Sequence, residues 1–195
     1  MGLLFMNSDD SAVELLRKDH EKVKSLFRNF EAATGRETQR IVGEVLDELE
    51  AHATAEEELF YPAVLGDAPE AKAKLDESLE EHHVMKLLIA ELRDMNAGSE
   101  RYAAKFRVLA ENVRHHIKEE EAELFARART GKLDLIALGK EIERVKASWR
   151  TLFKRGAKDR RPPVDMRTTR KPRRTRPSRV TGVRTAKKSV KRSTG

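Results

Sequence analysis

Two similar stretches of the chain decide its fold: HATAEEELF at residues 52–60 and HIKEEEAELF at residues 116–125. In each of them a His is followed four positions later by a Glu. Side chains four residues apart lie on the same face of an α-helix, about one turn from each other. Each stretch therefore predicts a helix that directs an imidazole and a carboxylate to the same side.

Apolar residues continue outward from both stretches at steps of three and four, the period of an amphipathic helix. Two more segments have this period, and every apolar stripe contains a His. The stripes are Val13, Leu16, His20, Val23, Phe27 and Phe30; Val42, Val45, Leu49, His52, Glu56, Leu59 and Ala63; Leu75, Leu79, His82, Met85, Ile89 and Leu92; and Phe106, Leu109, Val113, His116, Glu120 and Leu124. Short polar or Gly- and Pro-containing breaks separate the segments, so we predict an all-α, up-down-up-down four-helix bundle.

A fifth periodic segment follows the bundle. Its stripe is Ile136, Leu138, Ile142, Val145, Trp149 and Leu152. Residues 154–195 then carry 17 Lys or Arg and only two Asp, which leaves 23 basic and 31 acidic residues in the rest of the chain. We predict a bundle at 9–129, an additional helix at 132–153 that packs on the bundle or caps one end, and a disordered basic tail at 154–195.

The composition excludes several classes of protein. The 195 residues include no Cys, which rules out disulfide frameworks, zinc ribbons, iron–sulfur clusters and thiol catalysis. No apolar run predicts a transmembrane segment, and the first residues do not resemble a secretory signal. We expect a cytoplasmic protein in which only His and carboxylate side chains can hold a metal.

Six polar residues occupy stripe positions where a bundle normally has Leu or Ile. An ionised Glu inside a bundle is unfavourable by several kcal/mol unless a cation pairs with it, and these stripes contain no Lys or Arg. The predicted metal ligands are His20, His52, Glu56, His82, His116 and Glu120. This set is too large for one tetrahedral zinc, but it suits two metals that share carboxylates. We predict two non-haem irons, with manganese or zinc as alternatives, and open positions for dioxygen, peroxide or nitric oxide.

These motifs resemble the hemerythrin-like family, the HHE cation-binding domain, over roughly residues 9–129. The motifs are Asp19-His20, His52-x-x-x-Glu56-Glu57 running into Phe60-Tyr61-Pro62, Glu81-His82 with Leu87-Leu88 and Glu91-Leu92, and His116-x-x-x-Glu120-Glu121 before Leu124-Phe125. The resemblance implies a di-iron site in which Glu56 and Glu120 bridge the metals and the four His are terminal ligands. Oxygen-carrying hemerythrins differ, with a second His on the third helix and an Asp in place of Glu120. The resemblance thus leaves iron-dependent sensing, peroxide or nitric oxide chemistry, and iron handling open.

Two ligand positions have a neighbouring His as an alternative. His83 follows His82, and His115 precedes His116. Both alternatives lie on more polar flanks of their helices, so we assign His82 and His116 as the ligands.

Three other residues lie close to the predicted ligands. Glu57 and Glu121 are each turned about 100° from the stripe, which favours a solvated role or support of a ligand over direct metal binding. Tyr61 can approach the metals from the end of its helix, although an aromatic residue before Pro62 is more typical of packing.

The tail has basic clusters at 160–163, 170–177 and 187–192 and no aromatic residue. This pattern favours salt-sensitive contact with DNA or RNA, with a solvated tail as the alternative and an anionic membrane surface as the third choice. Our leading hypothesis is a di-iron protein that binds or senses dioxygen, peroxide or nitric oxide, or handles iron, and whose basic tail contacts nucleic acid. The alternatives are an enzyme that consumes peroxide or nitric oxide at the same metals, and a nucleic-acid-binding protein whose bundle is structural.

Overall fold

A computed structural model describes residues 10–155, and every regular element within that range is helical. The elements are α1 (Ala12–Ala32), α2 (Arg36–Ala55), the π-helical turn η1 (Glu56–Phe60), α3 (Tyr61–Asp67), the 3₁₀ turn η2 (Pro69–Ala71), α4 (Lys72–Asp94), α5 (Tyr102–Ala122), α6 (Leu124–Thr130) and α7 (Leu135–Arg155). The predicted tail, 154–195, lies outside the described residues except for the last two residues of α7. Its predicted disorder stays a prediction.

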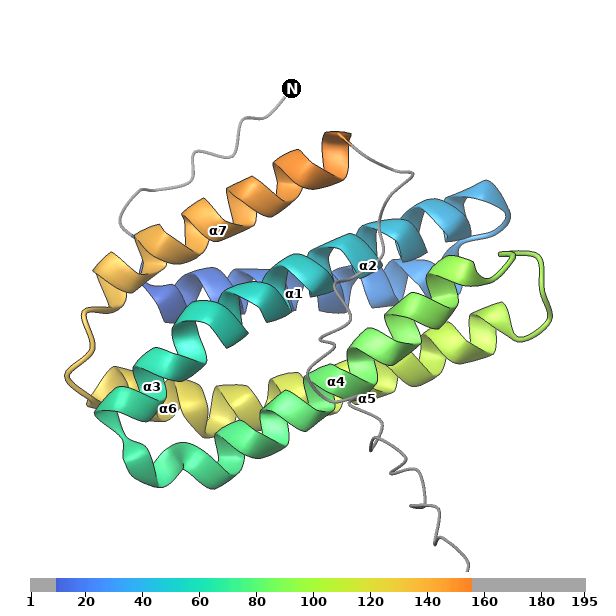
Figure 1. Ribbon diagram of the computed structural model, residues 1–195. Coiled ribbons are helices and arrows are strands. Elements are labelled where there is room, and N and C mark those ends of the chain that lie inside the picture. Colours follow the sequence, from blue (N-terminus) through green and yellow to red (C-terminus); the bar gives the residue numbers. More distant parts are fainter. Residues whose placement is uncertain (1–9, 156–195) are drawn as a thin grey trace, which may run out of the picture. The chain divides into compact units, whose positions relative to one another are not determined.

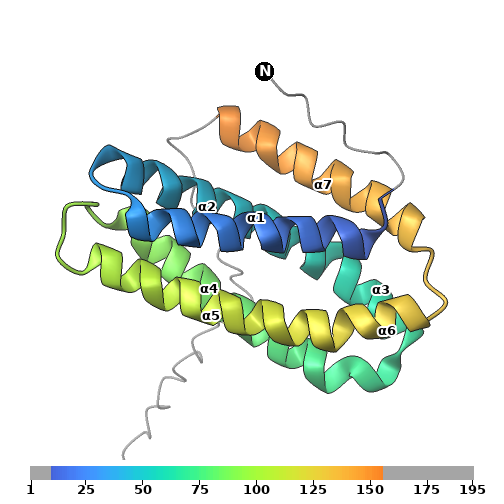
Figure 2. The same ribbon diagram turned by 180° about the vertical axis from the view of Figure 1, so that it is seen from behind.

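The helices form two antiparallel pairs, which confirms the predicted four-helix bundle. One pair is α1 with α2 and its continuation through η1 and α3, and the other is α4 with α5 and α6 (Figure 1). α7 lies along α1 and α2, on their far side from α4 and α5, as the two opposite views show (Figure 2). None of the helices in the described part is long and apolar enough to cross a bilayer.

Local signals fix the start of α1 and the turn that leads from α1 into α2. α1 begins with a capping box, in which the Glu14 N–H donates to Oγ of Ser11 at 3.3 Å and the Ser11 N–H donates to Oε2 of Glu14 at 3.0 Å. Such a cap stabilises a helix by about 1 kcal/mol. The turn into α2 places Gly35 at φ 59°, a backbone conformation that side-chain-bearing residues rarely adopt.

The apolar core is divided into two clusters, one at each end of the bundle. Phe27, Phe30 and Phe106 belong to the cluster near the α1–α2 and α4–α5 connections. Phe60 and Phe125 belong to the other cluster, beside the start of α1 and α7. The predicted ligands lie in the layer between the clusters, so packing holds this layer from both sides.

Two residues of the predicted stripes are exposed. Leu79 is 42% exposed, and Ser78 is buried in its place because α4 keeps the step of three after Leu75. Ile136 is 40% exposed, because Leu135 rather than Ile136 is in phase with Leu138 and Ile142 on the inner face of α7.

The π-helical turn η1 changes the register of the second stripe. Leu59 and Ala63 are only partly buried, whereas Phe60 and Val64 are fully buried. A π-helical turn accommodates one extra residue compared with an α-helical turn. The chain therefore advances its buried face by one position just after Glu56.

α7 packs closely on the beginning of α1. Ile142 is buried at the centre of its inner face, and Gly139 lies one turn before it. A Cβ at Gly139 would come within 2.5 Å of the Asp10 carbonyl oxygen and 3.0 Å of the Ala12 nitrogen. The absence of a side chain at Gly139 thus permits this close approach.

Candidate metal centre

All six predicted ligand residues converge in one buried layer of the bundle. The contributions are His20 from α1, His52 from α2, Glu56 from the first position of η1, His82 from α4, and His116 and Glu120 from α5. They form two groups, each with ligand atoms within 4.8 Å of one another: His20, His52, Glu56 and Glu120 in one, and Glu56, His82 and His116 in the other. Glu56 belongs to both groups.

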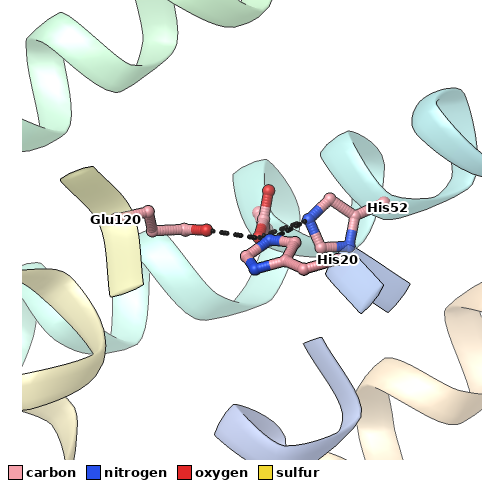
Figure 3. A group of neighbouring side chains, drawn as sticks. His20, His52 and Glu120 are labelled. Atoms are coloured by element: carbon pink, nitrogen blue, oxygen red, sulfur yellow. Dashed lines mark hydrogen bonds and ion pairs between the residues drawn. The ribbon is translucent and has the colours of Figure 1, made fainter. Parts of the chain in front are cut away.

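The first group is built around His20 and His52, which we call the α1/α2 half. The Nε2 atoms of these two histidines lie 3.0 Å apart. Nε2 of His52 lies 2.8 Å from Oε1 of Glu56, and Nε2 of His20 lies 3.3 Å from Oε2 of Glu120. Figure 3 shows His20, His52 and Glu120 pointing toward one another from three helices.

The second group is built around His82 and His116, which we call the α4/α5 half. Their Nε2 atoms lie 3.1 Å apart, and Nε2 of His82 lies 3.4 Å from Oε2 of Glu56. Glu56 therefore presents one oxygen to each half. This is the disposition expected of a carboxylate that bridges two metals.

The outer nitrogen of each histidine faces a further carboxylate. Nδ1 of His20 lies 2.9 Å from Glu121, and Nδ1 of His82 lies 2.9 Å from Glu57. Because an ionised carboxylate only accepts hydrogen bonds, each Nδ1 donates, and in a neutral imidazole the lone pair is then on Nε2, which faces inward. Partners of this kind orient the histidine ligands of metal sites.

The other two outer carboxylates connect neighbouring helices. Asp19 precedes His20 in the chain but lies 3.2 Å from Nδ1 of His52. Glu81 precedes His82 but lies 2.7 Å from Nδ1 of His116. The motif residues Asp19 and Glu81 thus support the histidine of the adjacent helix, a pairing that their sequence positions do not reveal.

The centre of the layer brings several buried acceptor atoms close together. All four carboxylate oxygens of Glu56 and Glu120 are buried and have no hydrogen-bond partner within the described residues, although imidazole nitrogens lie nearby. With the four Nε2 lone pairs also directed inward, neutral histidines would leave this cluster electrostatically unfavourable. The arrangement fits bound cations.

When no metal is bound, protons on the histidines supply part of the positive charge that balances the carboxylates. Burial opposes a charge on His52, but the carboxylates of Glu56 and Asp19 outweigh it and raise the pKa of His52 to about 10. The same opposition between burial and the carboxylates of Glu56 and Glu57 raises the pKa of His82 to about 9. Burial works against the charge of Glu56 as well, yet the nearby imidazoles hold its pKa well below the usual range. Protons and metal ions therefore compete for these atoms.

Tyr61 lies at the centre and is not only a packing residue. Its hydroxyl lies 3.4 Å from Nε2 of His82, and its ring stacks on the same imidazole. Burial and the negative charge of Glu56 raise the pKa of Tyr61 well above its ordinary value, so the phenol stays protonated.

The two alternative histidines do not reach this layer. His83 is exposed on α4. His115 is 63% exposed and lies 3.0 Å from Glu119 on the surface.

Two cavities border the predicted ligands. A small one of about 10 Å³ lies beside all four histidines and is otherwise walled mainly by apolar side chains such as Met85 and Val113. A groove of about 330 Å³ lies between α4 and α5, is lined by Glu77, Glu80 and His115 among others, and reaches His82 and His116. The α4/α5 half is therefore the one nearer to open solvent.

Comparison with known proteins defines the class. The hemerythrin HHE cation-binding domain model matches residues 11–128, and the chain belongs to this family. A solved hemerythrin HHE cation-binding-domain protein of Mycobacterium kansasii has the same fold, with a TM-score of 0.65 and 23% identity, covering 74% of this chain and 91% of that one.

A curated relative, described as a DNA nickase, comes from Nostoc sp. (strain PCC 7120). It is 31% identical over 122 residues, which are 62% of this chain and 34% of the relative. The chain thus spans about a third of the length of that relative.

Proposed function

We propose that the protein is a non-haem di-iron protein in which His20, His52, His82 and His116 are terminal ligands and Glu56 and Glu120 bridge the metals. The observation that carries this proposal is the set of four buried carboxylate oxygens without hydrogen-bond partners, facing four inward Nε2 atoms. Iron suits this mixed His and carboxylate set, with manganese or zinc as the alternatives. When bound, the iron pair would supply affinity for small oxidants and nitric oxide.

Metal content tests the proposal directly. Protein produced with iron and purified without chelator should contain about two irons per chain by elemental analysis. His52→Ala and Glu56→Ala should abolish this stoichiometry, whereas His83→Ala, which changes an exposed neighbour of a ligand, should preserve it. One zinc, no metal in a folded protein, or two irons retained in His52→Ala would refute the assignment.

The proposed ligand is dioxygen, peroxide or nitric oxide, which the protein binds or senses. The space beside the four histidines is small and mostly apolar, which limits a ligand to a few atoms. Tyr61 does not line that space and belongs to the apolar cluster on the other side of the ligand layer. A ligand bound on the Tyr61 side of the metals can accept a hydrogen bond from its hydroxyl, whose raised pKa keeps the proton in place. Iron handling uses the same ligands and needs no further residue.

An enzyme that consumes peroxide or nitric oxide is the alternative for the same site. Among residues 10–155 we identify no separate nucleophile or general base, so turnover would depend on the metals and Tyr61. Repeated turnover of peroxide or nitric oxide by the iron form, absent in the metal-free form, would favour the enzyme. Stoichiometric binding without turnover would favour the sensor or carrier.

Nucleic-acid contact is a second candidate function. It is favoured by the basic residues of 154–195 and by the relative described as a DNA nickase. Binding to duplex DNA should weaken steeply with salt and should be lost when Arg173, Arg174 and Arg176 are replaced by Ser together with Lys187 and Lys188. Nicking of supercoiled plasmid by the full chain, compared with a Glu56→Ala variant, would show whether the metals take part. Unchanged DNA binding in the tail variant would exclude a role for the tail.

A further inference from the structure

Lys146 of α7 reaches into the bundle and distinguishes the two halves of the metal centre. Building on the proposed di-metal function, we propose that Lys146 positions His52 through Asp19, so that the metal in the α1/α2 half is retained while the metal in the α4/α5 half exchanges with solution. Lys146 is a positioning residue here, since it contacts no proposed ligand atom itself.

The contact is buried and specific. Lys146 is only 6% exposed, an unusual state for a lysine, and its Nζ donates to Oδ2 of Asp19. The same oxygen accepts from Nδ1 of His52 at 3.2 Å. Asp19 is thus held between a cation and a ligand imidazole, and both contacts restrict the orientation of the His52 ring.

The corresponding carboxylate of the other half has a weaker environment. Glu81 accepts from Nδ1 of His116, as Asp19 does from His52, but its other oxygen lies 3.9 Å from the exposed side chain of His115. Its side chain is about twice as exposed as that of Asp19, at 23% against 11%. His116 is therefore oriented by a carboxylate that solvent can reach.

The two halves also differ in their access to solvent, and the α4/α5 half is again the more open one. The groove between α4 and α5 reaches His82 and His116, and acidic residues such as Glu77 and Glu80 line it. Negative charge at the mouth of a groove raises the local concentration of cations. α7, by contrast, packs along α1 and α2 and places Ile142 and Lys146 on the inner side.

α7 is an addition to the matched family domain in this chain. The domain match ends at residue 128, and α7 begins at Leu135. The close approach at Gly139 brings α7 near enough to α1 for Lys146 to reach Asp19 two turns later. The helix thus packs on α1, α2 and η1, and its buried lysine reaches the carboxylate that supports His52.

The test is the rate at which a chelator removes ferrous iron from the full chain under anaerobic conditions. The wild-type protein should release iron in two phases of about one iron each, and the slow phase should be about 10-fold or more slower than the fast one. Lys146→Met should speed the slow phase by about 10- to 100-fold, the range expected when a residue that supports a ligand is removed, and should leave the fast phase unchanged. Lys140→Met, which changes an exposed lysine of the same helix, is the matched control and should release iron as the wild type does.

A second variant tests whether Lys146 positions His52 or only neutralises the charge of Asp19. Asp19→Asn with Lys146→Met removes both buried charges, so the thermal midpoint should return toward the wild-type value even if Lys146→Met alone is destabilised. An amide accepts more weakly than a carboxylate, so the slow phase should stay fast in this folded double variant. A slow phase restored to the wild-type rate would show that Lys146 only neutralises Asp19 and would overturn the proposal.

The remaining outcomes are distinct. Two irons that leave the wild-type protein in one phase, or an unchanged slow phase in folded Lys146→Met, would overturn the inference and leave the di-metal function intact. A general structural defect would speed both phases and would also contradict it. Failure of the wild-type chain to bind iron at all would refute the proposed function itself.

Discussion

Tyr61 and Phe125 occupy equivalent places in the two halves of the candidate metal centre. Each lies five residues after the glutamate of its helix pair, and each stacks on a histidine. The ring centroids are 5.5 Å apart for Tyr61 and His82, and 5.4 Å apart for Phe125 and His20. Both halves therefore have an aromatic ring stacked on a histidine in the same arrangement. Only the ring in the α4/α5 half, that of Tyr61, carries a hydroxyl.

Replacing Tyr61 by Phe should change ligand binding but not metal content. The variant keeps the stacked ring and loses only the hydroxyl near His82, so we expect about two irons per chain, as for the wild type. Loss of one hydrogen bond to a bound ligand is worth about 1 kcal/mol, or roughly fivefold in affinity. Titration of the ferrous protein with nitric oxide, followed by visible absorption, measures this change.

Tyr102→Phe provides the control for that measurement. Tyr102, the other tyrosine of the chain, is buried in the apolar cluster away from the ligand layer. Its variant should bind nitric oxide as the wild type does. Equal nitric oxide affinity in Tyr61→Phe and Tyr102→Phe would show that the Tyr61 hydroxyl does not contact the ligand.

The bundle and the convergence of the six residues were predictable because helical periodicity alone determines which residues share a face. His20, His52, His82 and His116 all occupy stripe positions, and antiparallel pairing places them at one level. The alternatives His83 and His115 fall outside the stripe, and the structure places them at the surface. The helical period was therefore enough to choose His82 and His116 over their neighbours.

Other features depend on contacts that no period encodes. The π-helical turn at Glu56–Phe60 adds a residue to the register, so the sequence stripe missed Phe60 and Val64. Asp19 pairs across helices rather than with its neighbour in the chain. Lys146 is charged and would ordinarily be assigned to the solvent face, whereas the negative charge of Asp19 holds it inside.

Replacing the outer carboxylates should weaken metal binding without removing a ligand. Glu57→Gln and Glu121→Gln each exchange an ionised acceptor at a histidine Nδ1 for a neutral amide. We expect a loss of about 10- to 100-fold in metal affinity, measured by competition with a chelator of known affinity. Glu58→Gln, which changes an exposed residue of the same turn, should retain the wild-type affinity. An unaltered affinity in both Glu57→Gln and Glu121→Gln would contradict the supporting role of these carboxylates.

The metal-free protein should become less stable as the pH rises. Carboxylates raise the pKa of His52 to about 10 and that of His82 to about 9 in the folded state, against about 6.5 in the unfolded chain. The stabilising contribution of a raised pKa is complete below the unfolded value and is lost as the pH passes through the folded value. The free energy of unfolding should therefore fall between pH about 6.5 and about 10, as measured by urea denaturation at several pH values.

Glu56→Gln tests the cause of that pH dependence. Removing the charge of Glu56 removes a carboxylate shared by His52 and His82, so the decline in stability should become shallower. Metal affinity should show the opposite trend in the wild type and rise with pH, since metal displaces protons from the imidazoles. A metal-free protein whose stability stayed constant or increased over this range would contradict the assigned proton positions.

Gly139→Ala should displace α7 from α1. The new Cβ would meet backbone atoms of Asp10 and Ala12 rather than a flexible side chain, so relief requires movement of the helix. Overpacking of this kind is typically destabilising by about 1–3 kcal/mol, which thermal denaturation followed by circular dichroism would detect. Gly43→Ala is the matched control, since its Cβ would meet no atom within 4 Å. In the interior of α2 that control should stabilise the protein by up to about 1 kcal/mol. Because Lys146 lies on the helix that moves, Gly139→Ala should also speed the slow phase of iron release. A destabilised Gly139→Ala variant that released iron at the wild-type rate would show that the contact of Lys146 with Asp19 tolerates displacement of α7.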